Sequence, residues 1–128
     1  MEYELTVNQE QRRVSTIWGS SVTDESLMEY QKTVWSDATL HGFDEVIDFR
    51  KVDEIKVTTN GLRAVATLAA AMDEPGTKSR FAVVVGNPLS FGLARMYETF
   101  RGLDDRATRD VAVFEDLAPA LAWLDEER

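Results

Sequence analysis

The sequence of 128 residues contains no cysteine, only 7 glycines and 3 prolines, and a single histidine. The absence of cysteine excludes a disulfide scaffold, thiolate zinc sites, iron–sulfur clusters and a cysteine nucleophile. His41 has no second histidine with which to bind zinc, and a lone loop histidine is more often solvated than catalytic. Because 44% of the residues are hydrophobic, the chain should fold as an ordinary globular domain. We predict that it is not an enzyme and has no catalytic residues, no metal and no other cofactor.

Positive charge is also scarce, with 14 Lys and Arg residues against 23 Asp and Glu, a formal net charge of −9. An acidic surface repels phosphate backbones, so we expect no nucleic-acid partner. The chain begins without the basic and apolar regions of a signal peptide and has no apolar run near the ~20 residues that a spanning helix needs. We therefore expect a cytoplasmic protein without a transmembrane segment. No linker interrupts the sequence, and we treat residues 1–128 as one domain.

Hydrophobic periodicity predicts the order of the secondary structure. Strand patterns occur at five places: residues 3–7, 14–18, 43–49, 81–85 and 110–114. Helical spacing occurs at four places: residues 24–36, 60–72, 88–100 and 117–124. Thr23, Asn87 and Asp116 are the expected N-caps of three of these helices. The order ββαβαβαβα predicts an α/β fold, in which an N-terminal antiparallel hairpin joins a mixed, mostly parallel sheet with about four helices on its faces.

Acidic residues gather around the third predicted strand and the loop after it. They could suggest a divalent-cation site, but Arg50 and Lys51 lie among them and no spacing matches a known cation loop. We interpret the cluster as a solvated face of mixed charge. Its acidic members are Asp44, Glu45, Asp48, Asp53 and Glu54.

The segment from Gly86 to Gly92 lies at a strand-to-helix junction, where open α/β sheets tend to bind ligands. It lacks the glycine and lysine patterns of phosphate-binding and dinucleotide-binding loops. Spacing predicts that one helical stripe faces the sheet, namely Leu89, Leu93, Met96 and Phe100. Phe91 would then point outward, as a contact for a partner, an apolar ligand or a membrane surface.

The stretch from Val46 to Leu62 resembles the central motif of STAS domains, the anti-sigma-factor antagonists typified by SpoIIAA. In that family a strand that ends in an aspartate is followed by a loop and by Asp-Ser-Ser/Thr-Gly-Leu, which opens a helix and carries a phosphorylated serine. The resemblance places Asp48 at the strand end and Thr58-Thr59-Asn60-Gly61-Leu62 at the helix start, with Thr59 as the phosphoacceptor. This chain departs from the motif at Thr58 and Thr59 and has a longer loop. Phosphorylation at a helix N-terminus is a physically sensible switch.

Other segments are similar to a bacterial subgroup of SpoIIAA-like proteins described as STAS/SEC14-like. These segments are residues 34–37, 42–48, 113–117 and 120–124. The resemblance spans nearly the whole chain and implies the SpoIIAA-like fold.

The resemblance leaves two functions open. The first is a non-enzymatic binding or regulatory domain that engages a protein partner, such as a kinase or an anti-sigma-like regulator, through Asp48, Thr58, Thr59, Asn60 and Gly61. The alternative is a SEC14-like module that binds an apolar ligand such as a lipid, or docks peripherally on a membrane, through Asn87, Leu89, Phe91 and Met96. The acidic charge argues against anionic lipid surfaces. A homodimer through an alanine-rich or aromatic helix face is also open.

Overall fold

A computed structural model describes residues 2–128 and contains a five-stranded sheet. Its strands lie in the order β1-β2-β4-β6-β7. β1 and β2 pair antiparallel, and every other neighbouring pair is parallel. The mixed, mostly parallel sheet with an N-terminal hairpin is therefore confirmed. The strands are β1 (Tyr3–Asn8), β2 (Arg13–Trp18), β4 (Asp44–Asp48), β6 (Ser79–Val84) and β7 (Arg109–Phe114).

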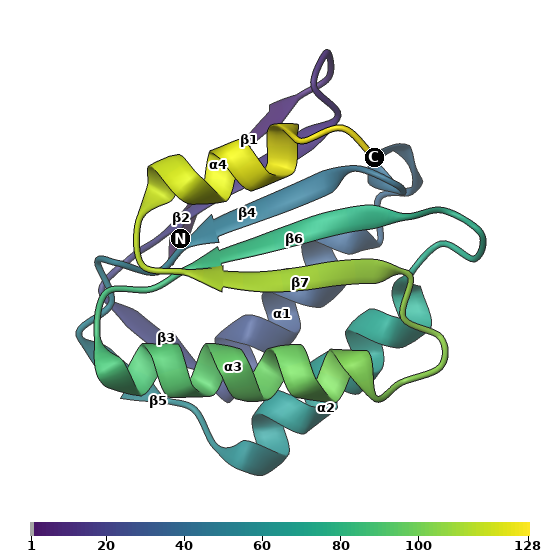
Figure 1. Cartoon of the computed structure of the whole chain (residues 1–128). Helices are drawn as coiled ribbons and strands as arrows, with labels where there is room; N and C mark the ends of the chain where they lie inside the picture. The colour runs from purple at the N-terminus through teal and green to yellow at the C-terminus, as the bar shows by residue number, and fades with distance from the viewer. Residues whose placement is uncertain (1) are drawn as a thin grey trace.

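The helices cover the two faces of the sheet unequally (Figure 1). Three of them lie on one face: α1 (Asp24–Trp35), α2 (Thr59–Met72) and α3 (Pro88–Gly102). The shorter α4 (Leu117–Asp125) packs alone on the opposite face, over a small core. A 3₁₀ turn, η1 (Ala38–Leu40), follows α1. The four helices agree with the prediction, and the three-helix face holds the larger core.

The sequence analysis missed a second, two-stranded sheet formed by β3 (Ser21–Thr23) and β5 (Glu54–Lys56). The loop expected after the third predicted strand therefore contains a strand, because β5 pairs with β3 and Ile55 packs against the main core. A three-residue strand is too short to display a period of two among charged neighbours. In Figure 1 this small sheet lies at the carboxyl ends of the parallel strands, near the start of α3.

Local hydrogen bonds fix where the helices begin. Thr23 and Ser26 form a reciprocal capping box at the start of α1. Asn87 caps α3, since its Oδ1 accepts a hydrogen bond from the Ser90 amide at 2.9 Å. Asp116 occupies the N-cap position of α4, but its side chain makes no capping hydrogen bond. The predicted starts of these three helices are confirmed.

The predicted orientation of α3 is wrong. The helix buries Ser90, Ala94 and Arg101, whereas Leu89 keeps 59% of its surface exposed. Of the predicted stripe, Phe100 contacts α2, where the Arg63 guanidinium lies 4.9 Å from the centre of the Phe100 ring, and Leu93 borders the space between α3 and the sheet. The sheet-facing side of α3 thus carries Ser90, Ala94 and Arg101 beside Tyr97, and small or polar residues of this kind suggest an outer surface when periodicity alone is considered.

Candidate functional site

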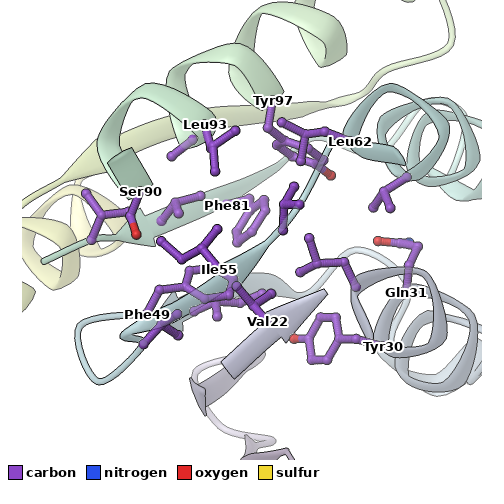
Figure 2. A pocket seen from close by; sticks show the side chains of 18 of the residues that line it. Val22, Tyr30, Gln31, Phe49, Ile55, Leu62, Phe81, Ser90, Leu93 and Tyr97 are labelled. Atoms are coloured by element: carbon purple, nitrogen blue, oxygen red, sulfur yellow. The ribbon is translucent and has the colours of Figure 1, made fainter. Parts of the chain in front are cut away.

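A cavity of about 100 Å³ lies between the main sheet and the three helices on its larger face (Figure 2). Its wall also includes residues of β3 and β5, so the small second sheet helps to enclose it. Most of the lining side chains are aliphatic or aromatic, among them Val22, Ile55, Leu62, Phe81 and Leu93. An apolar cavity of roughly 150 Å³ stays dry and takes up benzene, so this space suits a single ring or a short alkyl chain.

Few polar groups reach the cavity. Ser90 lies toward one end and Gln31 toward the other (Figure 2). The Gln31 amide donates to the sulfur of Met72 at 3.7 Å, and the Tyr97 hydroxyl accepts from Arg101 at 3.2 Å. Within residues 2–128 no hydrogen bond is found for the hydroxyl of Ser90, although this residue is only 9% exposed.

A buried ion pair closes the cavity at the amino ends of the strands. Arg109 donates from Nη1 to Glu45 Oε1 at 2.7 Å, and both side chains are almost fully buried. Glu45 Oε2 accepts from the hydroxyl of Tyr30 at 2.7 Å and from the indole of Trp35 at 3.1 Å. Tyr30 also exchanges a hydrogen bond with Thr16. This network joins α1, β2, β4 and β7, and it satisfies both carboxylate oxygens.

The two tyrosines of the cavity wall remain uncharged at neutral pH. Burial raises the pKa of Tyr30 well above its ordinary value, and the Glu45 carboxylate raises it further. Burial also raises the pKa of Tyr97, an effect that the nearby Arg101 only partly offsets. Neither phenol can therefore serve as a base in this cavity near pH 7.

The prediction of a solvated acidic face is wrong for Asp44 and Glu45, which are 8% and 3% exposed. Asp44 Oδ1 accepts from the Arg80 amide and from Arg128 Nη1, each at 2.8 Å. Both counter-charges lie far away in the sequence. Arg128 is 84 residues from Asp44, and Arg109 is 64 residues from Glu45. Such distant counter-charges leave no local pattern from which burial could be predicted.

Beside this network lies a second buried ion pair. Arg101 donates to both oxygens of Asp73 at 2.9 and 2.8 Å, and the Thr108 amide donates to the same carboxylate. Nearby, His41 Nδ1 lies 3.0 Å from Glu74, and His41 is partly exposed. Between these groups there is room for little more than one water molecule, since the space measures about 20 Å³.

The start of α2 is exposed but already holds an acidic side chain. Asp24 accepts from the Thr58 amide at 2.9 Å and from the Thr58 hydroxyl at 2.6 Å. Its carboxylate rests directly against Gly61, where a Cβ atom would clash with it. Thr58, Thr59 and Asn60 are all exposed, so other parts of the chain do not cover this helix start.

Asp48 does not join the α2 start. It shares a sheet face with Val46, which packs under α4, whereas α2 lies on the other face. Arg50 donates to Asp48 through its amide and its guanidinium at 2.8 to 3.0 Å. Partial burial opposes ionisation of Asp48, but these hydrogen bonds outweigh it and lower the pKa of the carboxyl. The structure therefore brings together Thr58, Thr59, Asn60 and Gly61, without Asp48.

The predicted contacts at the start of α3 lie beside the cavity and not on its wall. The wall contains Ser90, but not Asn87, Leu89, Phe91 or Met96. Leu89 and Phe91 flank Ser90 in the sequence, and they are 59% and 36% exposed. The sequence analysis missed Ser90 and Gln31 as cavity residues. One signal could have found Ser90, because the small residues Ser90 and Ala94 are four positions apart and thus share one helix face.

Within residues 2–128 no group of three or more acidic or histidine side chains is placed to hold a metal ion. In that same range, no helix has both the length and the apolar character needed to cross a bilayer. Comparison with protein-family models, with curated proteins and with solved structures gives no match.

Proposed function

We propose that the protein is a non-enzymatic domain that binds a small apolar molecule in the cavity between the sheet and helices α1, α2 and α3. The observation that carries this proposal is the cavity itself, an apolar space of about 100 Å³ inside a chain of 128 residues. Ligand sites in proteins are typically concave and apolar, with a few well-placed polar groups. The wall of this cavity has that composition.

The energetic cost of the cavity supports a role in binding. Protein interiors are packed as densely as organic crystals, and an empty volume of this size costs on the order of 2 kcal/mol. Filling the space with one larger side chain would recover part of that free energy. A bound ligand would recover the same free energy, so a cavity that is unfavourable when empty is consistent with a binding site.

The exposed side chains next to the cavity fit the same proposal. Leu89 and Phe91 lie on either side of Ser90, so an apolar pair on the surface adjoins the Ser90 end of the cavity. We assign these two residues to the first contact with an apolar ligand or with the membrane that contains it. Asn87 keeps the helix start in place through its cap, and Met96, further along α3, is half-buried.

The test combines two measurements on the purified chain. Native mass spectrometry after incubation with a lipid extract should recover a bound small molecule. An NMR titration with toluene should shift the signals of cavity residues such as Leu62 and Val83, and leave those of the exposed Ile17 unchanged. A chain that recovers no molecule and shows no shift with saturating toluene would contradict the proposal.

A second candidate is the regulatory role suggested by the STAS resemblance, with a protein partner at the start of α2. The observation that favours it is the exposure of Thr58, Thr59 and Asn60 at an open helix start. Against it, Asp24 already occupies this N-terminus, and its charge would repel a phosphate on Thr59.

A pull-down that compares the wild-type chain with Thr59→Glu tests this second role. Thr67→Glu is a matched control, because Thr67 is an exposed threonine further along the same helix. If Thr59 controls a partner, its variant should alter the set of captured proteins and the control should not. Identical sets from all three chains would count against a switch at Thr59.

A further inference from the structure

The cavity wall offers no charge to a ligand. Among the residues that line it in the described chain, none is lysine, arginine or histidine. Its one carboxylate, Glu45, already accepts three hydrogen bonds, from Arg109, Tyr30 and Trp35. An anionic ligand would find no counter-charge there, and a cationic ligand would have to compete with Arg109. Burying an unpaired charge is strongly unfavourable.

Arg109 cannot turn toward a ligand without breaking its own contacts. Its Nε donates to Ser79 at 3.0 Å, and its Nη2 donates to the carbonyl of Phe43 at 2.9 Å. Its guanidinium also lies 4.2 Å from the centre of the Trp35 ring. The positive charge is thus held against Glu45, and the pair presents no net charge to the cavity.

One polar side chain of the wall makes no hydrogen bond within residues 2–128, that of Ser90, a residue only 9% exposed. The Tyr30 and Tyr97 hydroxyls are engaged by Glu45 and Arg101, and Gln31 is partly open to solvent. The amide of Ser90 is held by Asn87, which fixes the residue, but its hydroxyl has no hydrogen-bond partner in residues 2–128. The hydroxyl is therefore free to form a hydrogen bond with a ligand oxygen placed beside it.

We infer that the ligand is an uncharged molecule with an apolar body and a hydrogen-bonding oxygen, such as a small alcohol or ketone, and that Ser90 binds that oxygen. The inference rests on the proposed function and adds the chemical class of the ligand. The cavity volume limits the buried part to about one ring or a short alkyl chain.

Four probes with the same ring test the inference: toluene, benzyl alcohol, benzoate and benzylammonium. Their dissociation constants can be measured by NMR titration or calorimetry at pH 7. We expect benzyl alcohol to bind roughly threefold to tenfold more tightly than toluene, because one hydrogen bond is gained. We expect the two ions to bind at least about 100-fold more weakly than benzyl alcohol, because each must leave water without a partner charge.

The Ser90→Ala variant isolates the hydroxyl. It should bind toluene within about twofold of wild type and lose the preference for benzyl alcohol. Ser20→Ala, at an exposed position away from the cavity wall, should keep that preference. Thermal unfolding of both variants establishes that they fold.

The outcomes test separately the charge of the ligand, the role of Ser90 and the proposed function. If toluene binds but an ion binds within tenfold of benzyl alcohol, the inference that the ligand is uncharged is wrong. If Ser90→Ala keeps the preference for the alcohol, Ser90 does not bind the ligand oxygen. If no probe binds, toluene included, the proposed function itself fails and the inference fails with it.

Discussion

The layer between the sheet and its three helices differs between its two ends. At the amino ends of the strands, Glu45 and Arg109 form a buried ion pair in which both carboxylate oxygens are satisfied. At the carboxyl ends, Val83, Val85 and Ser90 border an apolar cavity that no side chain fills. Directional hydrogen bonds thus close the amino end of the layer. The carboxyl end is lined by apolar side chains that leave a space between them.

This difference indicates how a small domain can keep a cavity without collapsing into it. Hydrogen-bonded ion pairs hold α1 and β7 at fixed positions relative to β4, because their geometry tolerates little displacement. Apolar walls alone would relax inward and shrink the void. The carboxyl ends of parallel strands are also the place where open α/β sheets usually bind ligands. We expect the polar end to provide rigidity and the apolar end to provide binding.

The largest effect should come from breaking the polar end. We expect Arg109→Met to lower the free energy of unfolding by about 3–5 kcal/mol, because it leaves the buried carboxylate of Glu45 without its counter-charge. Urea denaturation measures the change. Arg95→Met is the control, because the ion pair of Arg95 with Glu98 is exposed and should contribute less than about 1 kcal/mol. Similar losses in the two variants would remove the contrast between the buried and exposed pairs.

Breaking the contact between α1 and α2, next to the cavity, should lower the free energy of unfolding by less than the loss of Arg109. Thr58 caps α2 and also donates to Asp24, while its neighbour Val57 lines the cavity. We expect Thr58→Ala to cost about 1–2 kcal/mol, from the lost cap and the lost link to α1. Thr58→Ser retains the hydroxyl and should stay close to wild type in thermal unfolding. An equal loss in the serine variant would assign the effect to the methyl group instead.

The sequence predicted the fold where the pattern is local. The continuous apolar run that contains Val83 has the form of a central strand, and Thr23 and Asn87 are recognisable caps. Pattern analysis failed where partners are distant in the chain. The burial of Glu45 depends on Arg109, and β5 depends on its pairing with β3, so neither leaves a period in its own segment.

The candidate site was harder to predict than the fold. A cavity is an absence of side chains, and it depends on the sizes of residues from seven elements at once. Only the small residues Ser90 and Ala94 on the inner side of α3 hinted at it. An outward-facing aromatic side chain such as that of Phe91 suggests a contact, yet Phe91 lies beside the cavity and not in it.

A variant that fills the cavity should raise the free energy of unfolding, unlike the variants that break the ion pair or the helix cap. Ala94→Met places a long, adaptable side chain on the cavity wall, and we expect a gain of about 1 kcal/mol in the free energy of unfolding. The same variant should no longer bind toluene, because the space is occupied. Ala71→Met is the matched control on the exposed side of α2 and should leave toluene binding unchanged. A stabilised Ala94→Met chain that still binds toluene would place the ligand elsewhere.

The smallest effect should come from an exposed ion pair near the polar end. Arg106 donates two hydrogen bonds to Asp104 from its guanidinium and a third from its amide, and these bonds lower the pKa of that carboxyl to about 2 from an ordinary value of 3.8. The folded state therefore binds the proton of Asp104 less tightly than the unfolded state. The stability from this pair is complete above pH 3.8 and is lost as the pH falls toward 2.

We accordingly expect Asp104→Asn to lower the thermal midpoint slightly at pH 7 and to leave it unchanged near pH 2, so that its decline between pH 4 and pH 2 is shallower than in wild type. Asp105→Asn, which removes the neighbouring charge and leaves the Asp104–Arg106 pair intact, is the control. If the thermal midpoint of Asp104→Asn falls as steeply with decreasing pH as that of wild type, this pair contributes nothing to stability. Since the pair is exposed and screened by water and salt, its effect should stay well below that of Glu45 and Arg109, whose contact is buried.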